Sequence, residues 1–130
     1  LETAKISVSA VAAQDSSVLF FDVKRILSPC ASRCPFHTQL IQNLIAELAE
    51  KNIRLTGKIE HISQRRLRDK ILSYLSDFSK KQESPDFTIP FSRQELADYL
   101  SVDRSALSNE LGKLRKEGVL EFNRKRFRLL

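Results

Sequence analysis

The sequence lacks the features that mark membrane and secreted proteins. None of its apolar runs approaches the length needed to cross a bilayer, and it does not open with a charged segment followed by an apolar one. We therefore expect a cytoplasmic protein that inserts into no membrane. The first residue is Leu1 rather than Met, and the opening segment already has a strand-like pattern, so we expect the chain to begin partway through a domain.

Cysteine and histidine are also scarce. Cys30 and Cys34 stand four positions apart, and no further thiol can complete a four-cysteine zinc or iron–sulfur site. Only His37 and His61 could serve as general bases near neutral pH, and neither neighbours a plausible nucleophile. We therefore expect neither an enzyme nor a metal site. A redox switch at the cysteine pair is a minor hypothesis beside two ordinary reduced thiols.

The length and the charge distribution narrow the class of protein further. The 130 residues fit one ordinary domain or two small ones that share a connecting element. The net charge of +6 lies mainly in the second half, where residues 61–130 carry fifteen basic side chains against ten acidic ones, while residues 1–60 carry seven against six. A localised basic surface attracts polyanions, of which nucleic acid is the commonest.

The first part of the chain has the pattern of a β-hairpin. Residues 5–13 and 17–23 are rich in β-branched and aromatic side chains, and Gln14, Asp15 and Ser16 between them favour a turn. Because a lone hairpin is only marginally stable in water, we expect these strands to belong to a larger β domain whose other strands precede Leu1.

Residues 36–62 have the pattern of one long helix. Apolar side chains recur along one side at the spacing of a coiled-coil seam, although an ordinary core-facing helix would show a similar stripe. A chain this short offers little else to cover so long a stripe, so we predict a dimer helix. The predicted interface residues are Ile41, Leu44, Leu48, Leu55 and Ile62.

A second helix is predicted over residues 63–80, with Ser63 as its N-cap and an apolar face that includes Leu67, Ile71 and Leu75. A polar connection follows, and residues 87–91 at its end have the pattern of a short strand.

Two shorter helices joined by a tight turn come next. Ser92 and Glu95 have the spacing of a capping box, which predicts a helix from Ser92 to Leu100. Asp103 can cap the following helix, and Gly118 can close it at its C-terminal end. This arrangement is the helix-turn-helix skeleton.

The second of these helices carries a polar set on one face. Leu107, Leu111 and Leu114 are predicted to point inward, which leaves a set of polar side chains on the opposite face near the N-terminus. Helices that lie in the major groove of DNA present base-reading side chains at this place, and arginine, asparagine and serine can all pair with base edges. The predicted base-contacting residues are Arg104, Ser105, Ser108 and Asn109.

After Gly118, residues 119–122 and 126–130 are strand-like and flank a basic turn, so we predict a hairpin wing. Arg124, Lys125 and Arg126 are its predicted phosphate-contacting residues. The alternative is that these charges only protect an exposed strand edge from pairing.

The order of parts and the stretch RQELADYLSVDRSALSNELGKLRKEGVLEF resemble the cyclic AMP receptor protein and fumarate-nitrate regulator (Crp/Fnr) family of bacterial transcription factors. The resemblance is most specific at Arg93, Gln94, Glu95 and Leu96, followed by Arg104. It implies a homodimer built along the long helix, an N-terminal effector-sensing β-roll, and two recognition helices on a near-palindromic operator. RNA polymerase is implied as a further partner.

Site residues are carried over from the family position by position. Ser92 and Arg93 match positions that contact DNA phosphate, and Arg104, Ser105, Ser108 and Asn109 match positions that face bases. Ser105 and Asn109 differ from the Glu and Arg that many members have there, so we expect an operator other than the best-known family sequence.

The resemblance says less about the effector than about DNA binding. Cyclic AMP receptors have an Arg-Ser pair where this chain has Ile6 and Ser7. Since a phosphodiester buried in the β-roll needs a cationic partner, cyclic AMP is disfavoured, the effector is unknown, and no cofactor is expected in this segment.

Together these predictions describe an α+β chain. Residues 1–35 would be the C-terminal remnant of an effector-sensing, cyclic-nucleotide-binding-like β-roll, residues 36–62 a dimerisation helix, and residues 63–130 a winged helix-turn-helix domain. The predicted function is a DNA-binding transcription regulator of the Crp/Fnr type. The alternative is a winged-helix module for protein–protein contact, with the long helix as an assembly rod.

Overall fold

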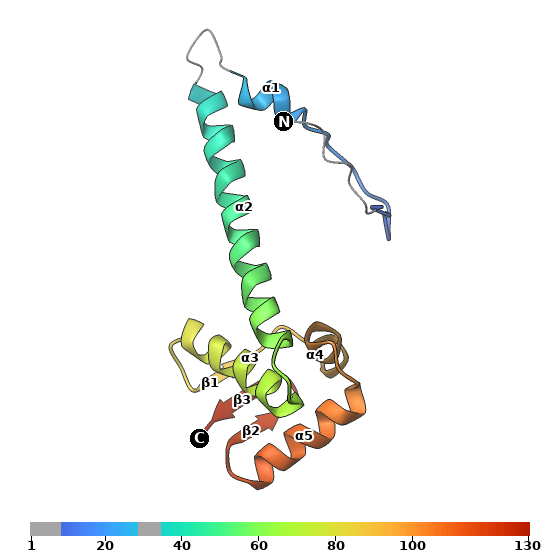
Figure 1. Ribbon diagram of the computed structural model, residues 1–130, viewed down its shortest axis with the longest axis vertical. Coiled ribbons are helices and arrows are strands. Elements are labelled where there is room, and N and C mark those ends of the chain that lie inside the picture. The colour runs from blue at the N-terminus through green and yellow to red at the C-terminus, as the bar shows by residue number, and fades with distance from the viewer. Residues whose placement is uncertain (1–8, 29–34) are drawn as a thin grey trace. The chain divides into compact units, whose positions relative to one another are not determined.

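The computed structural model describes residues 9–28 and 35–130 and divides the chain into two compact units, Leu1–Ile45 and Ala46–Leu130 (Figure 1). Helix α2, Pro35–Ile62, begins in the first unit and ends in the second. Its bounds agree with the long helix expected from the sequence. Four predicted features lie outside the described residues, namely Ile6, Ser7, Cys30 and Cys34.

The predicted N-terminal hairpin is not formed in the described part of its range. Residues 9–22 contain no strand, and the end of the second predicted strand belongs to helix α1, Val23–Leu27, whose first amides are capped by the carboxylate of Asp22. The apolar side chains of this segment remain in solvent, with Phe20 90% exposed and Val18 69% exposed. Since no described strand pairs with residues 9–22, neither hydrogen bonding nor apolar burial offsets the entropy of ordering a hairpin there.

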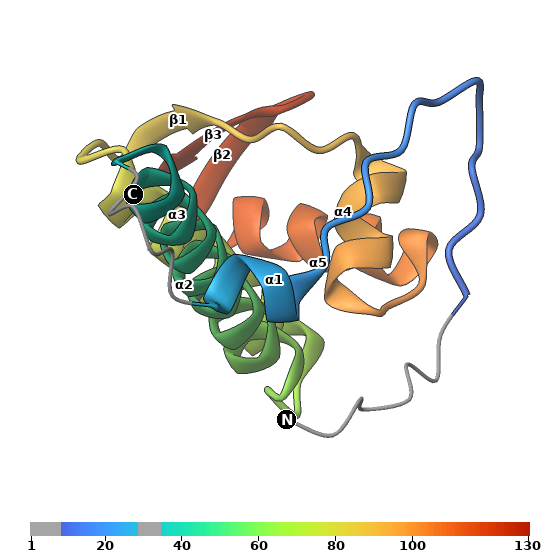
Figure 2. The same cartoon turned by 90° about the horizontal axis from the view of Figure 1, so that it is seen from above.

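Besides the second half of α2, the second unit contains three helices and a small sheet. Helix α3, Leu67–Lys81, is followed by strand β1, Asp86–Thr88, and then by α4, Arg93–Leu100, and α5, Arg104–Lys116. Strands β2, Leu120–Asn123, and β3, Arg126–Leu129, end the chain. The sheet order is β1-β3-β2 and both pairings are antiparallel. Seen from above, the three strands lie together on one side of α3 and α5 (Figure 2).

Helix α3 begins later than the sequence predicted. Its first residue is Leu67, and Arg66 stands at the N-cap position without a capping side-chain bond. Ser63 therefore does not cap this helix. Its backbone N–H donates to the Ile59 carbonyl and its hydroxyl to the Glu60 carbonyl, so Ser63 instead closes the C-terminal end of α2. A serine can satisfy the last carbonyls of one helix as readily as the first amides of the next.

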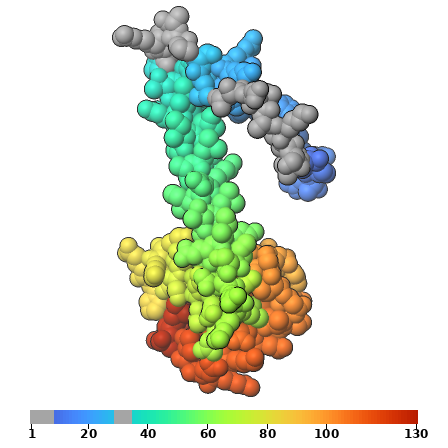
Figure 3. Space-filling model, in the orientation of Figure 1, coloured from blue at the N-terminus to red at the C-terminus, as the bar shows by residue number. Residues whose placement is uncertain are grey.

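The core of the second unit combines aliphatic side chains, mainly leucines of the helices, with aromatic rings of the sheet and of α3. The predicted inward residues Leu107, Leu111 and Leu114 are fully buried, and they pack with side chains from α3, α4 and β2. In the register of the sheet, Phe87 and Phe122 both stand opposite Phe127, and each ring stacks on that central ring. Each fully buried leucine or phenylalanine contributes about 1.5–3 kcal/mol relative to exposure. The yellow-green, yellow, orange and red parts of Figure 3 form this body.

Candidate nucleic-acid interface

The start of α4 has the capping box that the sequence predicted. The Ser92 hydroxyl accepts a hydrogen bond from the Glu95 amide at 3.3 Å, and the Ser92 amide donates to the Glu95 carboxylate at 2.5 Å. The amide of Ser92 favours the ionised carboxylate and holds the pKa of Glu95 below its usual value. These reciprocal bonds fix the point at which the chain enters the helix-turn-helix.

The turn between α4 and α5 is closed by backbone bonds. Ser101 has a left-handed conformation with φ of 54°, its amide donates to the Asp98 carbonyl, and the Val102 amide donates to the Ala97 carbonyl at 3.0 Å. This pair of bonds is the Schellman ending of a helix. Asp103 then caps α5 by accepting from the Ala106 amide at 2.8 Å, as the sequence predicted.

Helix α5 presents the four predicted base-contacting residues to solvent. Arg104, Ser105, Ser108 and Asn109 are all exposed, and Leu107 on the opposite face is fully buried. The structure therefore gathers one cation, one carboxamide and two hydroxyls on a single exposed face at the N-terminal end of a firmly packed helix.

The far end of α5 is also anchored. Gly118 has a φ of 71° and its amide donates to the Arg115 carbonyl, while the Val119 amide donates to the Leu114 carbonyl. This ending confirms that Gly118 closes the helix, since glycine has no Cβ to oppose a positive φ. An ion pair of 2.5 Å joins Arg68 of α3 to Glu117 just after α5.

Arg93 connects the first helix of the motif to the wing. Its guanidinium carbon lies 5.0 Å from the centroid of the Phe122 ring and 5.4 Å from that of Phe127. One of its nitrogens donates to the Arg124 carbonyl at 3.4 Å. Burial lowers the pKa of Arg93, but an arginine loses its proton only far above neutral pH, so the group remains a cation.

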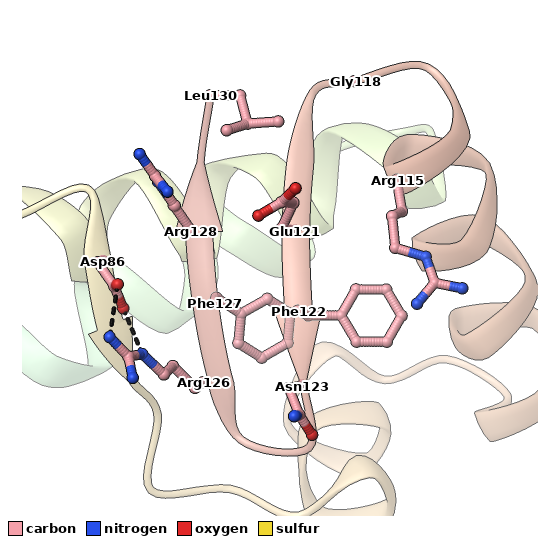
Figure 4. A pocket seen from close by; sticks show the side chains of 10 residues that line it. All are labelled: Asp86, Arg115, Gly118, Glu121, Phe122, Asn123, Arg126, Phe127, Arg128 and Leu130. Atoms are coloured by element: carbon pink, nitrogen blue, oxygen red, sulfur yellow. Dashed lines mark hydrogen bonds and ion pairs between the residues drawn. The ribbon is translucent and has the colours of Figure 1, made fainter.

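Arg115 was not among the predicted site residues, yet it belongs to the same arrangement. Its guanidinium carbon lies 5.0 Å from the centroid of the Phe122 ring, and Figure 4 shows the side chain extending from the end of α5 toward that ring. The guanidinium groups of two residues from different helices thus lie over the ring of one wing residue, Phe122. The only sequence feature that pointed to this arrangement was Phe122 in the first wing strand. Folding of the chain is needed to bring Phe122 close to Arg93 and Arg115.

The three predicted phosphate contacts of the wing have different surroundings. Arg124 is exposed in the turn, with a φ of 53°. Lys125 is also exposed, and its ammonium donates to the Pro90 carbonyl at 2.8 Å. Arg126 makes two hydrogen bonds of 2.7 Å to Asp86 of β1 (Figure 4), and these bonds hold the pKa of that carboxyl below its usual range. Arg126 is therefore already neutralised in part, whereas Arg124 and Lys125 make no ion pair within 4.0 Å among the described residues.

The predicted seam of α2 is unevenly covered. Leu48 is 58% exposed and Leu55 is 60% exposed, whereas Ile41, Leu44 and Ile62 are partly covered. The salt bridges of Glu47 with Lys51 and of Glu50 with Arg54 stand on the surface of the same helix. The middle of α2 thus carries an apolar strip that nothing described within this chain covers.

Two further findings concern metal sites and membrane-spanning helices. Within residues 9–28 and 35–130, no three His, Cys, Asp or Glu side chains stand close enough together to hold a metal ion. No described helix has the length and apolar character that crossing a membrane requires.

Comparison with known proteins finds a matching family model and similar solved structures. Residues 69–130 match the family model described as the Crp-like helix-turn-helix domain. The fold is similar to that of a CRP-family transcriptional regulator from Thermus thermophilus, with a TM-score of 0.55 and 24% sequence identity over 69% of this chain. The present chain spans 48% of the length of that protein. No curated protein sequence matches.

Proposed function

Residues 69–130 belong to the family of Crp-like helix-turn-helix domains, and from this premise we propose that the chain is the DNA-reading part of a Crp/Fnr-type transcription regulator. In this proposal α5 enters the major groove and reads base edges through Arg104, Ser105, Ser108 and Asn109. Two copies of the chain bind the two halves of a near-palindromic operator.

The observation that supports direct readout most strongly is the exposed N-terminal face of α5. A bidentate guanidinium matches guanine O6 and N7, and a carboxamide matches adenine N6 and N7. Arg104 and Asn109 supply these two groups on one exposed helix face, while the leucines behind them fix the helix in place. A helix used only for packing has no need of such a set.

The phosphate contacts of the proposal come from both sides of α5. Arg124 and Lys125 at the wing turn add affinity that does not depend on sequence. Ser92 and Arg93 are proposed to contact phosphate from the start of α4. Because the Arg93 guanidinium packs on Phe122 and Phe127, its position is set before DNA arrives. Arg126 is proposed as the weakest of these contacts, since Asp86 already binds its guanidinium.

The homodimer is proposed on the apolar strip of α2. The predicted interface consists of Ile41, Leu44, Leu48, Leu55 and Ile62, and burying the exposed members against a second copy would remove their apolar surface from water. Control by an effector domain and contact with RNA polymerase remain parts of the proposal that rest on the family alone.

Single-residue variants of α5 and of the wing test direct readout. Arg104→Ala and Asn109→Ala should each weaken binding to the preferred duplex by about 1–3 kcal/mol and should relax the base preference at one position. Lys125→Ala is the matched control, because it should weaken binding to all duplexes alike and reduce the salt slope by about one. Electrophoretic mobility or fluorescence anisotropy with specific and scrambled duplexes measures both effects.

Unchanged affinity and unchanged base preference in the Arg104→Ala and Asn109→Ala variants would contradict direct readout by α5. That result would favour the alternative, a winged-helix module that contacts proteins.

A further inference from the structure

A pocket of about 490 Å³ lies within the unit Ala46–Leu130, away from the exposed polar face of α5. Its walls come from the second half of α2, from α3, and from Pro90, Phe91 and Tyr99, the last of which belongs to α4. The volume is within the range of about 300–1,000 Å³ that is typical of small-molecule sites. We call it the aromatic pocket.

Three rings that contact one another form one side of the aromatic pocket. The Tyr99 ring lies 5.1 Å from that of Phe91 and 5.2 Å from that of Tyr74, and the Tyr74 and Phe91 rings are stacked at 6.0 Å. The aliphatic chains of Ile53 and Leu55 also line the pocket. This lining suits a flat apolar group better than a strongly hydrated one.

The two phenols are polar groups without a protein partner. Tyr74 is only 6% exposed, and neither its hydroxyl nor that of Tyr99 makes a hydrogen bond within the described part of the chain. Burial raises the pKa of both tyrosines, so both hydroxyls stay protonated and can donate. Among the described residues no side-chain polar atom is both buried and without a partner, so water reaches these hydroxyls, and a ligand oxygen in the pocket would replace that water.

The charge of the lining is mainly positive. Lys51 and Arg54 are paired with glutamates of their own helix, and Lys81 is paired with Asp77 at 2.7 Å. Lys58 has no carboxylate within 4.0 Å among the described residues, and its ammonium lies 5.4 Å from the centroid of the Tyr99 ring. One cation is therefore free to pair with an anionic ligand beside the aromatic wall.

His61, which also lines the aromatic pocket, already has partners within the protein and needs no ligand. It is 4% exposed, its Nδ1 is 2.9 Å from the Ser73 hydroxyl, and its Nε2 is 3.6 Å from Asp77. These contacts satisfy the imidazole within the protein. The groups of the pocket that have no protein partner are thus the two phenols, which water reaches, and the Lys58 ammonium.

We propose that the aromatic pocket binds a small aromatic carboxylate. The ring of the ligand packs against Tyr74, Phe91 and Tyr99, and its carboxylate accepts hydrogen bonds from Lys58 and from a tyrosine hydroxyl. The site is independent of DNA binding. Because its walls include both α2 and α4, an occupant would contact the long helix and the first helix of the helix-turn-helix at once.

The test is a titration of the full chain, without DNA, with 2-naphthoate and with the neutral comparator 2-naphthalenemethanol. Calorimetry gives the affinities, and amide chemical shifts in NMR spectra give the location. Naphthoate should bind at least several-fold more tightly than the alcohol, with shifts concentrated at Lys58, Tyr74 and Tyr99. Lys58→Gln should weaken naphthoate binding about tenfold, since a hydrogen bond to a charged group is lost.

Tyr74→Phe keeps the ring and removes only the hydroxyl, so it should weaken naphthoate binding about fivefold without preventing folding. Lys113→Gln is the matched control, because this lysine is equally cationic but stands on α5 and does not line the pocket. The Lys113→Gln variant should bind naphthoate with the same affinity as the unmodified chain.

Three results would overturn the proposal. The first is equal affinity for naphthoate and the neutral alcohol, and the second is an undiminished affinity of the Lys58→Gln variant. The third is a set of shifts that follows the exposed α2 side chains, such as Leu48, rather than the pocket. Sedimentation in the presence of naphthoate adds one further check, because dissociation of an oligomer would show that a second copy, not a small ligand, normally occupies the pocket.

Discussion

At the scale of single residues, Phe122 connects three parts of the second unit. Its ring stacks on Phe127 of β3, and it receives the guanidinium groups of Arg93 from α4 and Arg115 from α5. A cation over an aromatic face contributes about 0.5–1 kcal/mol at an exposed site and more when it is desolvated. One side chain thus fixes the wing relative to the helix-turn-helix.

The capping box at the start of α4 gives a prediction about pH. The pKa of Glu95 is lowered in the folded state, so its contribution to the free energy of unfolding is fully present above the ordinary value of 4.5 and is lost as pH falls through the lowered folded value. Glu95→Gln retains an acceptor oxygen but does not titrate. We therefore expect the variant to lose less stability than the unmodified chain between pH 5 and about pH 3, as measured by urea unfolding followed by circular dichroism.

Ser92→Ala and Ser105→Ala complete this comparison. Ser92→Ala removes the other half of the capping box and should cost about 1 kcal/mol at neutral pH. Ser105 is exposed and has no hydrogen-bond partner among the described residues, so Ser105→Ala should stay within about 0.5 kcal/mol. An identical loss of stability on acidification in the Glu95→Gln variant and the unmodified chain would show that this carboxylate does not stabilise α4.

At the scale of helices and strands, the sequence predicted best where the signal is local. The caps at Ser92 and Asp103, the ending at Gly118 and the inward leucines of α5 were confirmed, because a helix end needs only a few neighbouring residues to form. The hairpin expected over residues 5–23 was wrong for the described residues 9–22, because a strand needs a partner that no local pattern supplies. Ser63 was assigned to the wrong helix for a similar reason, since its hydroxyl had two possible partners.

Within the candidate site, the exposed face of α5 could be predicted from the sequence, whereas the contacts among the arginines, Asp86 and Phe122 could not. The exposure of Arg104, Ser105, Ser108 and Asn109 follows from the helical period and the buried leucines. The pairing of Arg126 with Asp86 and the stacking of Arg93 and Arg115 on Phe122 join residues far apart in the chain. Only the sheet register brings these groups together, so no spacing in the sequence could indicate them.

Helix α2 gives the prediction that belongs to this scale. Leu48→Glu places a charge in the middle of the proposed interface, where two copies would bring the carboxylates close together. We expect the variant to sediment as a monomer at concentrations where the unmodified chain is a dimer, with the same helical content.

Glu47→Gln is the control for the Leu48→Glu variant. It changes the neighbouring residue on the charged surface of α2, removes salt bridges that are solvent-exposed and should leave the dimer unchanged. Dimers of equal stability in the Leu48→Glu variant and the unmodified chain would contradict the assignment of the seam.

At the scale of the whole molecule, the second unit holds both proposed binding functions. Its exposed α5 face and wing turn are proposed to bind DNA, and its aromatic pocket is proposed to bind a small anion. The long helix supplies the apolar strip for a second copy. The pocket and the proposed dimer seam share Leu55, whereas Leu48 does not line the pocket and the exposed α5 face lies outside both, so variants of Leu48 and of the α5 face test their own functions separately.

The most direct test of the central claim is a selection of bound duplexes from a random DNA pool, carried out at two salt concentrations. If two chains read DNA through α5, the selected sequences should contain a two-fold symmetric motif whose half-sites lie about one helical turn, roughly 10 base pairs, apart. The motif should persist at the higher salt concentration. Recovery of no motif, with binding that only weakens as salt rises, would contradict sequence reading by this chain.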